Sequence, residues 1–550
     1  MNFPKGTLNR VRNFSAGPSK TVSGAAFVIA VSGIASRLLG FLRDRMLAGR
    51  FGAGDTLDAY YAAFRIPDTL YNLLVLGALS AAFVPVFTEL LARKDEAGAR
   101  RLAGGILRLL LLVISWLSLG VILIAPFIVS LITPGFSDSK QETTVALTRI
   151  MLLSPVLLGA SAVFGGVLIS SSRFVLYSLA PIFYNAGIIV GILFLVPAFG
   201  DSGLGYGVVL GALLHMLVQL PALRGFRFVR EHIPRFRTDV RRVVLLMIPR
   251  SLGMAANQVG LLLTTIFASS LASGSLAVFT LATNIESIPI GLFAVSFSLA
   301  AFPILSQSAA VRTNGEFFGT LARTTRRILF FVVPTSMILI VFRAQVVRVI
   351  LGAGRFDWDD TIATFSVLAW LSVSLFAQAL IPLFARAFFA LQDTKTPLLI
   401  ALSAEAVHIG LMPALIPFFG VSALAIAFSL GSVINGVLLL VALRRRIAEW
   451  DDRRFFREIG KIVLATLVAG LIAQVSKSVF LLAPSPLDTF GEVLLQLVFG
   501  TGVGLGVFCL MSISLRIEEF HSLRRFVLAK VLRTPEAVSS VEGHPEKGEW

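Results

Sequence analysis

The sequence predicts an all-α polytopic membrane protein with about fourteen transmembrane helices, built as two parallel six-helix repeats plus two C-terminal helices. Of the 550 residues, 56% are hydrophobic and only 14% are charged, whereas a soluble protein carries about 25% charged residues. Many continuous apolar runs are long enough to cross a hydrocarbon core of about 30 Å. Because these runs do not alternate with polar residues, they exclude a β-barrel.

Polar, glycine or proline breaks separate the apolar runs into fourteen candidate spans. Their approximate centres are Ile29, Leu76, Val121, Leu158, Ile189, Leu210, Leu261, Phe293, Pro334, Leu371, Ile409, Phe428, Ala469 and Val503. The first run begins near Thr21, after a basic segment that resembles a signal peptide in its charge order. Arg37 interrupts the run and no convincing small-residue cleavage site follows, so we interpret it as a retained helix.

Lysine and arginine gather in alternate loops. The loops near PAFGDSGLGY, SSLASGS, IPFFGVS and APSPLDTFGE carry neither residue, while the intervening loops are basic. The positive-inside rule places the basic loops, and with them both termini, in the cytoplasm. Two termini on one side require an even number of spans, which agrees with fourteen. The net charge of +17 is therefore assigned to cytoplasmic loops, and we expect no nucleic-acid partner.

The chain resembles itself at a spacing of about 220 residues. SAAFVPVFTELLAR (80–93) parallels SLAAFPILSQSAAVR (298–312), and two further pairs of segments match in the same order. Three collinear matches argue against chance similarity between apolar segments. The repeated unit contains an even number of spans, so both copies enter the membrane in the same direction, as in transporters with a binding site between the halves. The predicted domains are a cytoplasmic N-terminal segment (1–20), an N-lobe of helices one to six (21–225), a C-lobe of helices seven to twelve (240–445), helices thirteen and fourteen (458–515) and a cytoplasmic tail (516–550).

The stretch SRLLGFLRDRMLAGRFGAGDTLDAYYAAFRIP (36–67) resembles the first-helix signature of the MurJ (MviN) lipid II flippases, which belong to the multidrug/oligosaccharidyl-lipid/polysaccharide exporter superfamily. GALSAAFVPVF, ITPGF, ASSLASGS and QDTKTP match that family in the same order, and the resemblance covers about residues 20–515. It implies two lobes around a central cavity, with a groove for the polyprenyl tail formed by helices thirteen and fourteen. The implied activity moves lipid II from the inner to the outer leaflet of the bacterial inner membrane by alternating access, for peptidoglycan synthesis and cell shape.

The resemblance also implies a substrate site, in which cavity arginines handle the diphosphate. Arg37, Arg43, Asp44 and Asp58 fall on family motif positions. The chain departs from the family pattern at several positions. Tyr71, Asn72 and Leu76 stand where many members carry two arginines and a glutamate, Asn284 stands where many carry an arginine, and Arg250 lies in helix seven where better-known members are uncharged. The predicted substrate-binding residues are Arg37, Arg43, Asp44, Asp58, Arg250 and Asn284.

The residue chemistry supports such a site independently. A charged side chain at the bilayer centre costs between about 3 and more than about 10 kcal/mol, so these arginines need an anion, a water-filled cavity or the membrane interface. The planar guanidinium suits diphosphate oxygens, and Asp44 and Asp58 can pair with arginines when substrate is absent. Other interpretations stay open: Arg43 can snorkel to the interface, and Asp58 can pair with Arg65 or cap a helix. Arg45 and Arg50 can mark only an interface, and Pro249 is expected to break helix seven beside Arg250.

Two carboxylates in the C-lobe, Glu286 and Glu405, are the candidates for ion coupling, because an intramembrane carboxylate can take a proton or Na⁺. The alternative is that they make polar contacts between helices. His408 alone makes no metal site, and the glycines near 52–54 lack the lysine and strand of a nucleotide-binding loop. We therefore expect no enzyme activity, no cofactor and no metal, with membrane potential, H⁺ or Na⁺ as the open choices for a driving force.

The expected partners are lipid II, membrane lipids and other cell-wall synthesis proteins, with the chain itself a monomer. Two other functions stay open. One is a flippase for another polyprenyl-linked oligosaccharide or a drug exporter, because part of the usual cationic set is missing. The other is a membrane scaffold that recruits partners through its basic loops and tail, although a scaffold has no need for arginines inside its spans.

Overall fold

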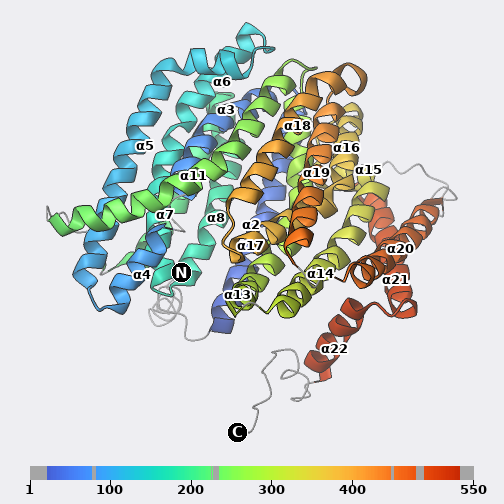
Figure 1. Ribbon diagram of the computed structural model, residues 1–550. Coiled ribbons are helices and arrows are strands. Elements are labelled where there is room, and N and C mark those ends of the chain that lie inside the picture. The colour runs from blue at the N-terminus through green and yellow to red at the C-terminus, as the bar shows by residue number, and fades with distance from the viewer. Residues whose placement is uncertain are drawn as a thin grey trace, which may run out of the picture. The chain divides into compact units, whose positions relative to one another are not determined.

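The computed structural model describes residues 22–76, 82–224, 226, 234–311, 313–447, 451–478 and 489–532. These residues are almost entirely helical and contain no strand (Figure 1). Contacts divide the chain into two compact units, Met1–Thr280 with Ile350–Asp360, and Leu281–Val349 with Thr361–Trp550. The predicted all-α class is confirmed, whereas the predicted lobe boundaries remain predictions.

Helices of the first unit follow one another with short connections. They are α2 (Val22–Phe51), α3 (Asp55–Tyr71), the π-helical turn η1 (Asn72–Leu76), α4 (Val84–Ala92), α5 (Glu96–Ile132), α6 (Asp138–Met151), α7 (Leu153–Ser170), α8 (Phe174–Val190), the π-helical turn η3 (Gly191–Leu195), α9 (Val196–Phe199), α10 (Ser202–Leu217), the 3₁₀ turn η4 (Leu220–Leu223) and α11 (Pro234–Ser269). Helix α12 (Ser275–Pro289) begins in this unit and continues into the second.

Helices of the second unit repeat much of this order. They are the π-helical turn η5 (Ile290–Ala294), α13 (Val295–Val311), α14 (Asn314–Val341), α15 (Arg343–Leu351), α16 (Trp358–Val373), α17 (Leu375–Ala390), α18 (Lys395–Phe419), α19 (Ser422–Arg446), α20 (Asp452–Ser476), α21 (Phe490–Ser514) and α22 (Glu518–Leu532). The end of α15 and the start of α16 are assigned to the first unit.

Ten helical segments of the described residues are long and apolar enough to cross a membrane. The pair α16 and α17, bent by 46° at its break, would make an eleventh. The predicted total of fourteen is compatible with this number and stays a prediction, because the second predicted span runs through residues 77–81, outside the described part of the chain.

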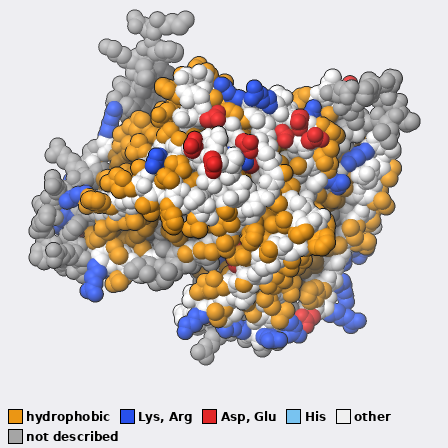
Figure 2. Space-filling view, turned by 90° about the horizontal axis from the view of Figure 1, so that it is seen from above, with side chains coloured by type: hydrophobic (Ala, Val, Ile, Leu, Met, Phe, Trp, Pro, Cys, Tyr) orange, Lys and Arg blue, Asp and Glu red, His pale blue; other side chains and the backbone are white. Residues whose placement is uncertain are grey.

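The surface also fits a lipid environment. On α5, Leu123 and Phe127 are 72% and 69% exposed, which would be unfavourable over a whole helix face in water. Figure 2 shows apolar side chains over much of one face, between separate groups of charged side chains. These exposed apolar side chains are what a bilayer-spanning helix presents to lipid.

The internal repeat is visible in the local backbone. Ser172 and Gln392 both have positive φ, near +56° and +59°, at the turn before α8 and α18 respectively. Gly200 and Gly420 have φ of +59° and +52° at the ends of α9 and α18, where a residue without a Cβ avoids strain. The π-helical turns η1 and η5 are likewise about 220 residues apart. Unusual conformations that recur at one spacing confirm the repeat.

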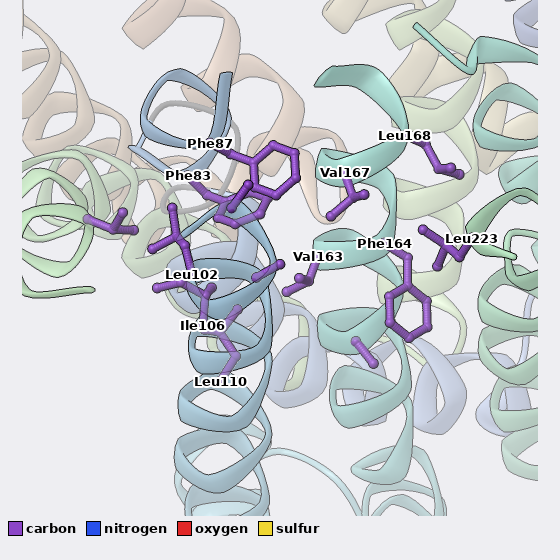
Figure 3. Close-up of a cluster of buried hydrophobic side chains, with 14 of the residues drawn as sticks. Phe83, Phe87, Leu102, Ile106, Leu110, Val163, Phe164, Val167, Leu168 and Leu223 are labelled. Carbon is purple, nitrogen blue, oxygen red and sulfur yellow. The ribbon is translucent and has the colours of Figure 1, made fainter. Parts of the chain in front are cut away.

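One hydrophobic cluster in the first unit joins α4, α5 and α7 (Figure 3). Phe83, which precedes α4, and Phe87 on α4 face Ile106 on α5 and Val163 on α7, and all four are nearly fully buried. The cluster fixes the start of the first unit's longest helix, α5, against its neighbours.

Helices α8 and α10 approach closely through glycines. A Cβ atom placed on Gly187 would lie 2.4 Å from the Gly211 backbone, a distance that real contacts do not reach. Small residues at such a seam let membrane helices pack backbone to backbone. We expect Gly187→Val to lower the thermal unfolding midpoint, because overpacking costs about 1–3 kcal/mol. Gly120→Val on α5, where no atom lies within 4 Å, is the matched control, and equal midpoints for the two variants would contradict this packing.

The QDTKTP motif forms the turn into α18. The Asp393 carboxylate accepts hydrogen bonds from the backbone N–H groups of Lys395 and Thr396, both at 3.0 Å, and pairs with Arg446 at 2.6 Å. The hydrogen bonds from Thr396, followed by Arg446, hold the pKa of Asp393 below its usual range. A lowered pKa in the folded state stabilises the fold above the unfolded pKa of about 4, and this stabilisation is lost as the pH falls through the folded value.

We therefore expect Asp393→Asn to lower the thermal unfolding midpoint at neutral pH and to match the parent chain at strongly acid pH. Thermal unfolding in detergent as a function of pH measures this. Glu142→Gln, an exposed carboxylate on α6, is the control. A deficit of Asp393→Asn that stays constant with pH would show that the carboxylate charge contributes nothing.

Candidate functional site

Arg43 and Asp44 form a buried ion pair on α2. Arg43 donates to Asp44 Oδ1 from Nε at 2.9 Å and from Nη2 at 2.7 Å. Its third contact runs from Nη1 to Asn185 Oδ1 on α8, at 3.0 Å. Asp44 is only 4% exposed and the Arg43 side chain 22%. The structure thus brings together two of the predicted site residues, with the acid neutralising the guanidinium.

Arg37 lies one and a half turns earlier on α2 and lines a cavity of about 450 Å³ within the first unit. The lining also includes a polar network in which Ser161 Oγ lies 2.7 Å from His215 Nδ1 and accepts from Gln219 Nε2 at 2.6 Å. Tyr71, at a position where many members of the resembled family carry a basic residue, lines the same cavity. The cavity therefore joins one cationic side chain to hydroxyl, imidazole and amide groups.

Asp58 lies among different partners from those of Arg43. Its carboxylate accepts from Lys140 Nζ at 2.7 Å and from the backbone N–H groups of Gly274 and Ala277 at 2.7 and 2.8 Å. Asp58 is 1% exposed, and Lys140 also lies 4.0 Å from the centre of the Phe136 ring. Asp58 thus caps the start of α12, one of the two interpretations left open, whereas the alternative pairing with Arg65 is not formed.

The other basic residues of the opening stretch have separate contacts. Arg65 donates to Thr265 Oγ1 at 2.9 Å. Arg45 donates to the carbonyl of Gly352, and Arg50 to that of Ile192 at 2.7 Å. These three arginines therefore join helices and loops of the first unit to one another.

The carboxylates expected for ion coupling differ in their surroundings. Glu286 on α12 is 1% exposed and accepts a hydrogen bond from the Gln378 side chain, while its Oε1 has no partner among the described residues. Glu405 on α18 is partly exposed and lies 3.0 Å from Nδ1 of His408. Of these two carboxylates, Glu286 is the more buried and the one with an oxygen that has no partner among the described residues.

Predictions were also made for Pro249 and Arg250 on α11 and for Asn284 on α12. The side chain of Arg250 lies outside the described residues, so its predicted role stays a prediction. The backbone of α11 runs from Pro234 to Ser269 without interruption, so the expected break at Pro249 is wrong. Long membrane helices tolerate proline when neighbouring groups satisfy the freed carbonyl. Asn284 is half-buried on α12, and its carbonyl accepts from Ser287.

An apolar groove of about 680 Å³ lies within the second unit. Its walls come from α14, the α16–α17 break and α20, with Val333, Met337, Phe376, Val463 and Leu467 among the lining residues. Helix α20 corresponds to predicted helix thirteen. The groove has the chemistry to hold a hydrocarbon chain, since few polar atoms line it.

Two residues that contact Arg43 and Asp58 were not predicted from the sequence. Asn185 lies 142 positions from its partner Arg43, and Lys140 lies 82 positions from Asp58. A polar side chain inside the apolar run YNAGIIV was a signal for Asn185, because such residues usually bond across helices. Nothing in the sequence pattern marked Lys140, except that it lies in LITPGFSDSKQETT (131–144), one of the repeated segments.

Comparisons with known proteins agree on one family. The family model described as lipid II flippase MurJ matches residues 47–485. A probable lipid II flippase MurJ from Rhizobium meliloti is 29% identical over 506 residues, covering 88% of this chain and 93% of the relative. One from Bdellovibrio bacteriovorus is 30% identical over 511 residues, covering 88% and 95%.

Solved structures match the fold. A lipid II flippase MurJ in an inward closed conformation aligns with a TM-score of 0.73 at 24% identity, covering 89% of this chain and 99% of that one. An inward-facing multidrug resistance MATE family transporter of the MOP superfamily aligns with a TM-score of 0.66 at 15% identity, covering 75% and 94%.

Proposed function

Because the chain belongs to the lipid II flippase MurJ family, we propose that it moves lipid II from the inner to the outer leaflet of the bacterial inner membrane. The observation that carries this proposal is the family match, which extends over residues 47–485. The chain is a multi-pass membrane protein of a transporter family, and we propose that it performs alternating access without catalysis. Both termini are assigned to the cytoplasm by the alternation of basic loops.

The barrier to this movement is the headgroup, because an unpaired diphosphate loses its hydration in hydrocarbon. Arg43 is suited to replace that hydration, since its guanidinium can exchange Asp44 and Asn185 for phosphate oxygens. Arg37 adds a second cation from the same helix. Arg250 and Asn284 are proposed as further substrate-binding residues.

Asp58 is assigned a different task within the same function. Lys140 and two backbone N–H groups already occupy its oxygens. We propose that it positions α12 relative to α3 rather than contacting the substrate.

The apolar groove of the second unit is proposed to hold the polyprenyl tail, because a long hydrocarbon chain needs a continuous apolar wall. Membrane lipids are expected to fill it in the absence of substrate. The monomeric state and contacts with other cell-wall synthesis proteins belong to the same proposal.

Complementation tests the function. A bacterial host is depleted of its own lipid II flippase while this chain is expressed, and lipid II on the outer leaflet is measured. We expect growth and lipid II exposure to be restored. Confirmed membrane expression without lipid II exposure would overturn the lipid II assignment and would favour another polyprenyl-linked oligosaccharide, a drug or a scaffold role.

A further inference from the structure

A buried chain of hydrogen bonds in the second unit begins at Glu286. Gln378 on α17 donates to the Glu286 carboxylate and, from Nε2, to Ser374 Oγ at 2.9 Å. Ser374 Oγ donates to Ser429 Oγ on α19 at 3.0 Å, and Ser429 Oγ donates to the carbonyl of Trp370 on α16 at 2.8 Å. Gln378 donates in both directions, to Glu286 and to Ser374, and from Ser374 onward each donor points away from the carboxylate.

The chain passes through the break in a membrane span. Ser374 is the residue between α16 and α17, whose axes differ by 46°. Its backbone N–H reaches only the carbonyl of Leu371, at 3.2 Å, and its Oγ lies 3.0 Å from the same carbonyl. The backbone and the hydroxyl of Ser374 therefore both contact the last turn of α16, at the bend.

Glu286 itself lacks the partners that an ionised carboxylate needs. It is 1% exposed, its Oε1 has no partner among the described residues, and burial and the Gln378 hydrogen bond are the influences acting on it. A buried carboxylate with one neutral donor is costly, and protonation removes most of that cost. Its polar neighbour presents an N–H group, whereas a hard metal cation needs several oxygen ligands.

Helices α14 and α16–α19 also carry charged groups. The titratable side chains on the described parts of α14, α16, α17, α18 and α19 are Glu316, Arg323, Arg326, Arg327, Asp359, Asp360, Arg386, Lys395, Glu405, His408, Arg444, Arg445 and Arg446. None of them forms an ion pair with Glu286 among the described residues. Helix α12 carries no second titratable group.

We propose that Glu286 is a proton-binding site whose protonation is transmitted through Gln378 and Ser374 to the bend between α16 and α17. When the proton sits on the oxygen that faces Gln378, Glu286 becomes a hydrogen-bond donor, and the Gln378 amide turns so that its oxygen takes the place of Nε2. That oxygen now faces Ser374, so the Ser374 hydroxyl donates to Gln378 and leaves Ser429 and the Leu371 carbonyl. One proton thereby reverses the direction of donation at the break.

This inference deepens the proposed function, on which its role in transport rests, by naming the proton as the coupled ion. The proposed change at the bend between α16 and α17 needs no substrate, so it is measured without lipid II. Spin labels on exposed Ile362 of α16 and Phe389 of α17, in a Cys509→Ala background that removes the single cysteine, report the angle at the break. The full chain is placed in lipid nanodiscs, and the distance distribution between labels is recorded from acid to alkaline pH.

We expect the parent chain to shift between two distance populations with pH. Glu286→Gln, which mimics the protonated acid, is expected to hold the acid population at every pH, and Ser374→Ala to lose the shift. Glu458→Gln on α20, a carboxylate paired with Lys461, is the matched control and keeps the shift. Infrared difference spectra check the proton itself, through a protonated-carboxyl band that is lost in Glu286→Gln.

A parent chain without a pH-dependent shift, or a Glu286→Gln variant that shifts like the parent, would overturn the proposal. Complementation separates this outcome from the function. Failure of lipid II exposure with an intact pH-dependent shift would overturn the lipid II assignment alone, whereas restored lipid II exposure with no shift would overturn the proton site alone.

Discussion

Arg43→Ala is expected to reduce lipid II exposure in the complemented host by roughly ten- to a hundredfold, since a charge-assisted hydrogen bond contributes about 1.5–3 kcal/mol. The guanidinium makes three short contacts on α2 and α8, and we propose that these are exchanged for phosphate oxygens during transport. Arg43→Lys keeps the charge without the planar fork and is expected to retain part of the activity. Lipid II accessible on the outer leaflet, normalised to protein in the membrane, is the measurement.

A second variant separates transport from folding. Arg43→Ala alone removes the ion-pair partner of the Asp44 charge, which is 4% exposed, and breaking a buried pair in this way costs about 3–5 kcal/mol. The double variant Arg43→Ala/Asp44→Ala removes that charge, so its membrane level is expected to recover while transport stays low. Arg93→Ala, whose side chain is 71% exposed in a pair with Glu89, is the control. Normal transport by the double variant would exclude Arg43 from the substrate site.

Asp58→Ala is expected to lower stability more than most single changes in this chain. The variant removes the buried partner of Lys140, which is 9% exposed and keeps its pair with the exposed Asp55, and it leaves the N–H groups of Gly274 and Ala277 without their carboxylate acceptor. Removing one partner of a buried ion pair costs about 3–5 kcal/mol. The thermal unfolding midpoint in detergent is the measurement, with transport in the complemented host as the functional readout.

A double-mutant cycle makes this prediction specific. Asp58→Ala/Lys140→Met removes both charges, so the combined loss of stability is expected to be smaller than the sum of the two single losses. Asp55→Ala is a useful comparison, because Asp55 also binds Lys140, at 2.7 Å, yet its own side chain is 67% exposed. Strict additivity of Asp58 and Lys140 would show that their contact contributes nothing to the fold.

The fold class and the repeat were predictable because hydrophobic run length and sequence self-similarity are properties of the chain itself. The charged residues of segment 36–67 could be identified as candidates, but the sequence could not tell substrate-binding residues from structural ones. Arg43 contacts Asn185, and Asp58 contacts Lys140, only after distant helices meet. Pro249 was expected to break a helix, and only the folded chain shows the backbone continuing through it. Glu286 was selected from its chemistry alone, whereas its partner Gln378 lies 92 positions further along the chain and becomes a neighbour only in the folded protein.

The recurring backbone also shows how far the two copies have specialised. At the spacing of 220 residues that separates Ser172 from Gln392 and Gly200 from Gly420, Ser161 and Gln219 correspond to Ile381 and Leu439. Both copies thus keep the same turns, but the first has polar side chains at two buried positions where the second has aliphatic ones. Different side chains at a few interior positions are therefore enough to give two copies of one scaffold different chemistry.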